Sequence, residues 1–238
     1  MAAPTGKAPS SVWTRPERPR REQPTLGREQ IVDAALALLD ADGLAGLSMR
    51  RLGTRLNAGA TSVYWHVANK DELLELAMDR VMSEVAVPDA AEAGGWRPAV
   101  AGYARSLRAM IRRHPWTVTL FGSRPMIGPN ATRVMDEVLT AFRHAGFTGH
   151  DLEYAWALVV DYVIGAAGSE ASRAAHQRGV TTDERIASMG TYLRRIDAER
   201  PRLAEHIRAV WAKEDDQVLE GRFAFGLECL LDGLETRR

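Results

Sequence analysis

Residues 47–74 read LSMRRLGTRLNAGATSVYWHVANKDELL, and this stretch decides the fold class. Ser48 is a favourable N-cap residue, and the leucines after it recur on one side of a short helix that ends near residue 57. The tight segment over residues 57–60 contains a glycine and leads into another short helix, over about residues 60–67. The order helix, tight turn, helix is that of a helix-turn-helix.

Helices are also predicted on both sides of this stretch. The preceding helix carries its apolar residues on one face, at Ile31, Ala35, Leu38 and Leu39. Asp42 and Gly43 predict its end, because glycine adopts the left-handed cap easily. In the following helix, Asn69 and Glu72 have the spacing of a capping box, and apolar residues continue toward Val85. The glycine-bearing turn therefore lies within a run of four predicted helices.

Beyond residue 95 the sequence gives only helical signals, without the alternation typical of a strand. Proline and glycine residues divide it into predicted helices over residues 97–113, 115–121, 129–145, 150–176, 182–198, 201–212 and 216–236. The chain is therefore predicted to be all-α, with one domain over residues 25–86 and another over residues 96–238. Residues 1–24 contain five prolines and few large apolar side chains, so we expect a disordered, basic, proline-rich arm.

The composition excludes several classes of protein. The 31 basic and 31 acidic side chains cancel, so binding to nucleic acid would need local clustering of charge. The lone Cys229 excludes a disulfide framework and a cysteine-rich zinc site, and it fits a reducing compartment. The most apolar run, residues 162–169, is far shorter than the roughly 20 residues of a membrane helix. No apolar signal region follows the N-terminal basic residues. We therefore expect a cytoplasmic protein without a membrane span.

Charge is clustered locally in the helix-turn-helix. Residues 43–70 contain Arg50, Arg51, Arg55 and Lys70 and no Asp or Glu. Arginines beside hydroxyl, phenol and imidazole groups suit both phosphate oxygens and base edges. The alternative is a small helical subdomain whose basic face is merely solvated, which is the commoner outcome for a lone basic helix. The charge pattern alone therefore leaves both interpretations open.

The same stretch resembles a known family. The runs LSMRRLG at residues 47–53 and TSVYWHVANKDELL at residues 61–74 are similar to the DNA-binding domain of the TetR (tetracycline repressor) family. The similarity covers about residues 26–85. It implies that the third helix enters the major groove and that an arginine reaches a base from the preceding helix, arginine being the usual partner of guanine. The predicted DNA-contacting residues are Arg50, Thr61, Ser62, Tyr64, Trp65, His66 and Lys70.

Some details of this region stay open. Residues 59–61 stand where tetracycline repressors carry larger or more rigid base-reading groups, so the resemblance does not give the operator sequence. Val63 is expected in the core, whereas Tyr64 and Trp65 fit either the core or a DNA contact. The arginines of the N-terminal arm suit phosphates or the minor groove, and an inert tail is the equal alternative. These arginines are Arg15, Arg18, Arg20 and Arg21.

The last predicted helix has two apolar stripes, and a monomer has only one core to offer. The wide stripe includes Leu219 and Phe223, and the narrow, opposite stripe consists of Val218, Phe225 and Cys229. We favour a subunit interface for this helix and for residues 150–176, as a four-helix bundle that the family resemblance also implies. The predicted interface residues are Trp156, Val160, Ile164, Ala167, Leu219, Phe223, Leu227 and Leu230. A two-fold dimer predicts a pseudo-palindromic operator.

Aromatic and sulfur-containing residues cluster in the second domain. Taken singly they are more often core residues, but as a set with a few polar groups they also fit the lining of a small-molecule site. The predicted ligand-binding residues are Tyr103, Met110, His114, Trp116, Phe121, Met135, Trp156, Asp161 and Tyr162, and Asn130 is a further polar candidate. We expect a small hydrophobic or amphipathic ligand that releases DNA by binding one conformation better. No metal ion or other cofactor is predicted.

These observations predict a homodimeric, ligand-responsive regulator of transcription. In it, residues 25–86 bind double-stranded DNA, and residues 96–238 bind the ligand and dimerise. A repressor is favoured, and an activator stays open. A DNA-binding regulator without an effector site is the first alternative. A helical enzyme is the second, and the absence of a nucleophile elbow, a phosphate loop and a zinc-protease motif argues against it.

Overall fold

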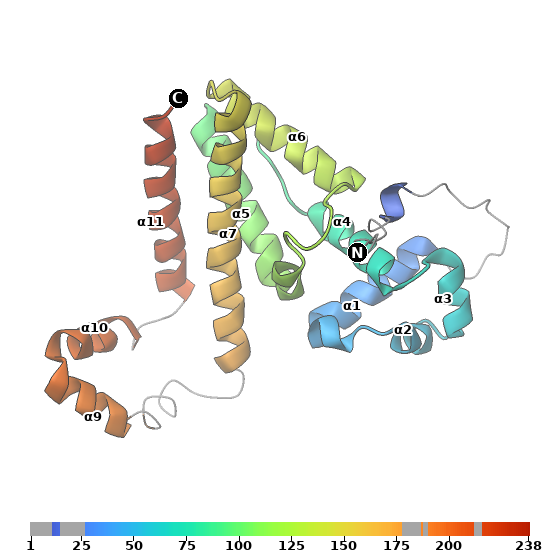
Figure 1. Ribbon diagram of the computed structural model, residues 1–238, viewed down its shortest axis with the longest axis horizontal. Coiled ribbons are helices and arrows are strands. Elements are labelled where there is room, and N and C mark those ends of the chain that lie inside the picture. The colour runs from blue at the N-terminus through green and yellow to red at the C-terminus, as the bar shows by residue number, and fades with distance from the viewer. Residues whose placement is uncertain (1–10, 15–26, 178–186, 188–189, 212–215) are drawn as a thin grey trace, which may run out of the picture. The chain divides into compact units, whose positions relative to one another are not determined.

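The computed structural model describes residues 11–14, 27–177, 187, 190–211 and 216–238, and these residues form helices and no strand (Figure 1). The all-α prediction is confirmed. In chain order the elements are η1 (Val12–Thr14), α1 (Arg28–Gly46), α2 (Met49–Arg55), α3 (Ala60–His66), α4 (Lys70–Met82), α5 (Trp96–Arg113), η2 (Pro115–Thr119), α6 (Pro129–His144), α7 (Gly149–Gln177), α9 (Gly190–Glu199), α10 (Pro201–Trp211) and α11 (Asp216–Glu235). None of these helices is long and apolar enough to cross a membrane.

The chain divides into two compact units, Met1–Val160 and Asp161–Arg238, and the boundary falls within α7. In the first unit, α1 packs on α2 and α4, and α2 packs on α3. Leu39, Leu52, Val63 and Leu73, one from each of these four helices, are almost completely buried. The predicted core position of Val63 is confirmed. We call α1 to α4 the head.

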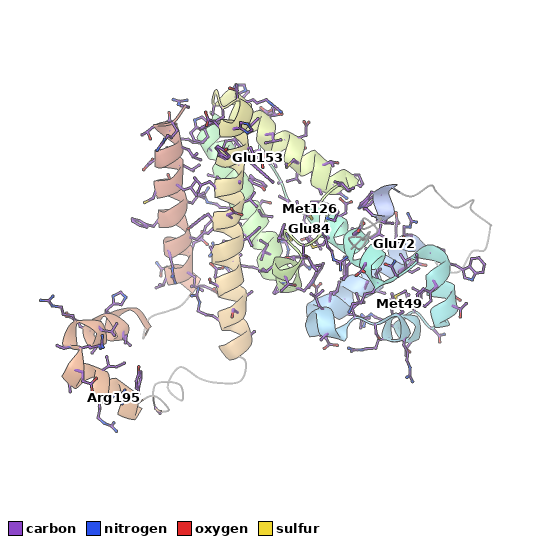
Figure 2. The ribbon with its side chains drawn as sticks, in the orientation of Figure 1. Met49, Glu72, Glu84, Met126, Glu153 and Arg195 are labelled. Atoms are coloured by element: carbon purple, nitrogen blue, oxygen red, sulfur yellow. The ribbon has the colours of Figure 1, made fainter. Side chains whose placement is uncertain are left out.

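Two helix ends in the head differ from the sequence prediction. Gly43 has a φ of 66° and interrupts the regular helix as expected, but the chain resumes helical geometry and α1 ends at Gly46. At the start of α4, the Asn69 side chain accepts a hydrogen bond from the backbone N–H of Glu72 at 2.8 Å. The carboxylate of Glu72, a residue labelled in Figure 2, in turn accepts from the N–H of Ala68 at 2.8 Å, one residue earlier than in a standard capping box. α4 ends at Met82, short of Val85.

A buried carboxylate joins α4 to α6. Asp79 is 5% exposed and accepts from the backbone N–H groups of Asn130 and Ala131, at 3.0 and 2.9 Å, and from the Asn130 amide at 2.9 Å. These N–H groups belong to the first turn of α6, where helices leave their donors unsatisfied and favour negative charge. Asp79 therefore caps α6 from a different helix, and it ties the head to the helices that follow.

Part of the N-terminal segment is ordered, which corrects the expectation of a disordered arm for residues 11–14. The Ser11 hydroxyl and the Val12 N–H both donate to Glu75 of α4, at 2.6 and 2.9 Å. Val12 is 8% exposed, and the Trp13 ring lies against Gly128, the N-cap of α6. The segment thus packs where α4 and α6 meet. The rest of the predicted arm lies outside the described residues.

Removal of this packed segment should destabilise the first unit. A variant without residues 1–14 loses the buried Val12 side chain and leaves the Glu75 carboxylate without two of its donors. We expect its free energy of unfolding to fall by about 2 kcal/mol. A variant without residues 1–10 is the matched control, because it keeps the whole packed segment. Urea unfolding curves check the prediction, and equal stability of the two truncated proteins would contradict it.

In the second unit, α7 and α11 lie close together through Tyr162. Its hydroxyl donates to the backbone carbonyl of Phe223 at 2.8 Å, and the two rings stack with centroids 5.5 Å apart. Gly226 makes this approach possible, because a Cβ there would collide with the Tyr162 hydroxyl. The α9 and α10 helices share a separate small core of Ile196, Ala204 and Ile207. α9 begins at Gly190, and the first residues of the helix predicted over 182–198 lie outside the described residues.

Candidate nucleic-acid interface

The turn between α2 and α3 presents α3 on the surface of the head (Figure 1). Ser48 caps α2 by accepting a hydrogen bond from the N–H of Arg51 at 3.2 Å, as predicted. Asn57 adopts a φ of 49° in the turn, a left-handed conformation that asparagine tolerates. Val63 and Val67 are fully buried and fix one side of α3 to the head. The opposite side is therefore held rigidly toward solvent.

The solvent face of α3 carries most of the residues predicted to contact DNA. Thr61 and Ser62 are exposed, Tyr64 is 45% exposed and Trp65 is 72% exposed, whereas His66 is half-buried. A Trp side chain so exposed in a helix of seven residues contributes little to the core of its own chain. The structure thus places Tyr64 and Trp65, which the sequence left undecided, on the same accessible face as the hydroxyl groups.

The arginines of α2 differ in their partners. Arg51 donates to the Asp42 carboxylate at 2.5 Å and to the backbone carbonyl of Gly46 at 2.8 Å, so it braces the end of α1. Arg50 and Arg55 are exposed, and their guanidinium groups make no hydrogen bond or ion pair with the described residues. Sequence alone could not distinguish these arginines, because their partners are set by tertiary packing. The structure leaves Arg50 accessible for an external acceptor.

Lys70 has a structural partner that the sequence did not suggest. Its ammonium group donates to the backbone carbonyl of Leu44 at 2.9 Å, and the side chain is half-buried. A lysine ammonium has three donors, so this contact uses one and leaves two for a phosphate. Lys70 therefore joins the start of α4 to the end of α1 while it keeps two N–H donors for an external acceptor.

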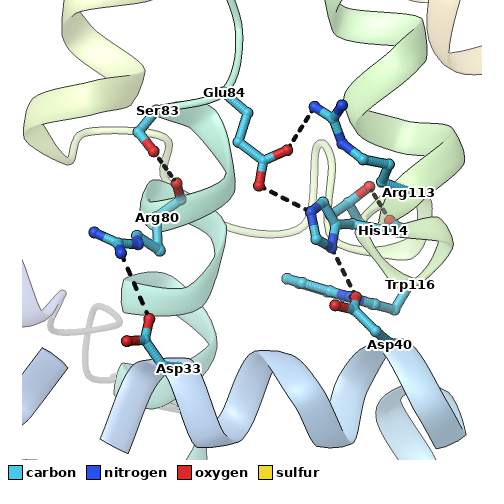
Figure 3. A network of polar contacts seen from close by, with 9 residues as sticks. Asp33, Asp40, Arg80, Ser83, Glu84, Arg113, His114 and Trp116 are labelled. Carbon is cyan, nitrogen blue, oxygen red and sulfur yellow. Dashed lines mark hydrogen bonds and ion pairs between the residues drawn. The ribbon is translucent and has the colours of Figure 1, made fainter. Parts of the chain in front are cut away.

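A polar junction links the head to α5 and η2, and the sequence analysis missed it (Figure 3). His114 donates or accepts at both ring nitrogens, toward Asp40 of α1 at 2.7 Å and toward Glu84 after α4 at 3.1 Å. The Trp116 indole N–H donates to the same Asp40 oxygen at 2.8 Å. Both aromatic residues were predicted to bind ligand. Their described polar side-chain contacts are with Asp40 of α1 and, for His114, also with Glu84.

The other predicted ligand residues have varied surroundings. Tyr103 and Met110 of α5 are buried, and the Trp156 indole N–H bonds to the Tyr103 hydroxyl. Burial raises the pKa of Tyr103, and the hydrogen bond from Trp156 partly offsets this. Phe121 and Met135 are half-buried. Asp161 is exposed, Tyr162 bonds to Phe223, and the amide of Asn130 bonds to Asp79.

The burial of the two α11 stripes differs from what the predicted interface requires. Phe223 and Leu227, which were predicted in the interface, are 1% and 0% exposed, and Ala167 of α7 is also fully buried. They pack inside their own chain. The narrow stripe, Val218, Phe225 and Cys229, is the exposed one, and Phe225 is 74% exposed. The sequence could not decide which stripe faces inward, because both are apolar. The remaining predicted residues, Trp156, Val160, Ile164, Leu219 and Leu230, are half-buried.

A helix-turn-helix head, followed by described residues that form only helices, is typical of DNA-binding regulators of transcription. Comparison with known families agrees. Residues 31–77 match the family of bacterial regulatory proteins named after tetR, and residues 87–238 match the tetracyclin repressor-like C-terminal domain. The chain belongs to the TetR family of transcriptional regulators. Proteins of this family and the relatives described next are named as regulators and not as enzymes.

Similar proteins match over nearly the whole chain. An HTH-type transcriptional regulator of Saccharopolyspora erythraea is 40% identical and covers 95% of this chain and 92% of its own length. The HTH-type transcriptional repressor DrrR1 of Streptomyces coeruleorubidus is 38% identical, with 94% and 83% covered. The crystal structure of ActR from Streptomyces coelicolor in complex with actinorhodin has a TM-score of 0.71 and 35% identity, and covers 88% of this chain and 96% of its own.

Proposed function

We propose that the protein is a homodimeric repressor that binds a pseudo-palindromic operator and leaves it when a small molecule binds. The observation that carries the proposal is the solvent face of α3. Two valines fix its inner side, while Trp65, Tyr64 and two hydroxyl groups are exposed. On the preceding helix, Arg50 is also exposed, and its guanidinium has no partner among the described residues. An α-helix of this kind fits the major groove, where arginine recognises guanine N7 and O6.

Electrostatics of the head support DNA as the partner. The window from Gly43 to Lys70 contains no acidic residue, and Asp42, just before it, is paired with Arg51. Three of the four acids of α4, Glu72, Glu75 and Asp79, are turned inward, since each is less than 10% exposed and accepts hydrogen bonds within the chain. The fourth, Asp71, is exposed and is paired with Arg124. A phosphate approaching α3 therefore meets few repelling charges, and phosphate contacts supply most of the affinity for DNA.

Dimerisation is supported by the exposed stripe of α11. A soluble monomer rarely exposes a large aromatic residue such as Phe225 beside further apolar residues on one helix face. α7 also exposes Tyr154 and Leu158, at 64% and 49%. A two-fold dimer would bury such surfaces and would present two α3 helices about one turn of DNA apart.

Control by a ligand is supported by the resemblance to ActR, whose structure contains actinorhodin. For this chain we propose a small hydrophobic or amphipathic molecule bound in the C-terminal domain. Tyr103, Met110, Phe121, Met135 and Trp156 remain the proposed contacts, with the Tyr103 hydroxyl as a polar anchor in apolar surroundings. We leave out His114 and Trp116, since their polar groups bond to the head.

Retention of DNA fragments from the source genome tests the proposal directly. The purified protein should select fragments that contain an inverted repeat, with enrichment beside its own gene, and a bound fragment should be released by a ligand found in a thermal-shift screen. Uniform weak retention of all fragments would contradict operator binding. Selective retention with no ligand that raises the unfolding temperature would support the alternative regulator without an effector.

A change at Lys70 should weaken binding to all DNA sequences to a similar degree. Lys70→Ala removes one phosphate contact, so the slope of log affinity against log salt should flatten by about 1. Arg51→Ala is the matched control, because Arg51 also contacts the backbone of α1 but is paired with Asp42. Fluorescence anisotropy at several salt concentrations checks this. An unchanged slope in Lys70→Ala would leave its ammonium group a purely structural role.

A further inference from the structure

His114 is the C-cap of α5, and it connects three separate parts of the first unit (Figure 3). It is 8% exposed, and its ring lies between Asp40 of α1 and Glu84, which follows α4. The ring Nδ1 is 2.7 Å from Asp40 Oδ1, and Nε2 is 3.1 Å from Glu84 Oε1. Each ring nitrogen is thus within hydrogen-bond distance of a different carboxylate.

The number of N–H groups on the ring decides whether both contacts can be hydrogen bonds. A carboxylate oxygen can only accept a hydrogen bond, so each nitrogen must carry a hydrogen to bind its partner. Neutral imidazole has one N–H and one lone pair, and the lone pair would face a negative oxygen at hydrogen-bond distance. Only the imidazolium form has two N–H groups. Both contacts are therefore hydrogen bonds at the same time only when the ring is protonated and the two carboxylates are ionised.

The charged groups around the ring decide which contact is lost when the proton leaves. Glu84 has a second partner, because its Oε2 is 2.6 Å from the guanidinium of Arg113, the last residue of α5. Asp40 keeps the Trp116 N–H at 2.8 Å and is the closer carboxylate. Asp40 from α1, Glu84 after α4 and Arg113 from α5 are the charged groups with described contacts here. A neutral ring keeps Asp40 most easily, so the contact to Glu84 is the one that breaks.

We propose that His114 is a proton-sensitive tie between the head and α5. The protonated ring holds α1, the end of α4 and α5 together, and the neutral ring releases the end of α4. Histidine is the side chain whose charge ordinarily changes between about pH 5 and pH 8, so the tie would respond to modest changes of pH. Glu84 lies where the chain leaves α4, the last helix of the head, so release of this contact would change how the head is held. Any effect of that change on DNA binding rests on the proposed function.

Stability measured at two pH values tests the tie without DNA. The stabilisation by protonated His114 is present at low pH and is lost as pH rises. Between about pH 6 and pH 8, the folding equilibrium constant should fall in both proteins or in wild type alone, and the fall should be about tenfold larger in wild type than in His114→Gln. A tenfold difference corresponds to the loss of about one charge-assisted hydrogen bond. His144→Gln, at an exposed histidine of α6, should behave like wild type. Equal pH dependence in wild type and His114→Gln would overturn the proposal.

Two further measurements keep the test decisive if His114→Gln folds poorly. Glu84→Gln changes a side chain that is 35% exposed, and it should also lose the extra pH dependence. Nitrogen NMR of the imidazole rings at about pH 6, the lower pH of the stability test, should show His114 with both nitrogens protonated. A neutral ring under those conditions would overturn the proposal. A protein that passes these tests and yet selects no operator would refute the proposed function alone.

Discussion

Phe225→Glu is expected to convert the protein from a dimer to a monomer at micromolar concentration. The phenylalanine is 74% exposed in the single chain, so a charged residue there leaves the fold of the second unit intact. In a dimer that buries the α11 stripe, the carboxylate would lose its water without gaining a partner, and burying an unpaired charge is costly. Sedimentation equilibrium measures the change directly.

The same variant should also lose operator binding. Two linked α3 helices reach their half-sites as one molecule, and linkage of this kind raises avidity by roughly 10²–10⁴-fold over a single site. We expect a loss of that order for a full operator and little change for an isolated half-site. Tyr192→Glu is the matched control, since Tyr192 is an exposed aromatic residue of α9, outside the stripe. A Phe225→Glu protein that sediments as a dimer would exclude the stripe from the interface.

Arg50→Ala should weaken operator binding by about 1–3 kcal/mol and broaden the choice of base at one position of each half-site. The guanidinium is exposed and has no partner among the described residues, so its removal costs little stability. The loss should be larger for the operator than for random DNA, because base contacts give specificity and phosphate contacts do not.

The control for Arg50 separates base reading from general charge. Arg105→Ala removes the same charge from an exposed position of α5, away from the head, and it should leave operator preference unchanged. Selection of binding sites from a randomised operator library measures the base preference. Affinity measurements on the operator and on random DNA then give the loss of binding on each. Equal losses on operator and random DNA in Arg50→Ala would assign this arginine to the phosphate backbone.

Local sequence signals were enough to predict the head. Cap residues such as Ser48 and Asn69, and the periodic burial of Val63 and Val67, act within one turn of a helix, so they can be identified from neighbouring residues. Gly43 was the exception: a glycine with positive φ can end a helix or merely bend it, and here α1 continues for three residues. The family resemblance added the expected orientation of α3.

The contacts that sequence reasoning missed join residues far apart in the chain. Glu75 binds Ser11 across 64 positions, and His114 binds Asp40 across 74 positions. No periodicity records such a pairing. For the same reason His114 was interpreted as a ligand contact, since a polar group among aromatic residues fits both a binding site and a satisfied junction. The burial of Phe223 and Leu227 within the chain was unpredictable for a related reason, because hydrophobicity alone does not say which apolar stripe of α11 a single chain buries.

The contact of Ser11 with Glu75 has a practical consequence for handling the protein. An affinity tag or fluorescent reporter joined directly to Ser11, in place of residues 1–10, would begin close to the meeting point of α4 and α6, where Trp13 lies against Gly128. Bulk at that position would press on the contact between α4 and α6. Binding assays with N-terminal fusions therefore need a spacer or a cleaved sample, and an untagged protein should serve as the reference.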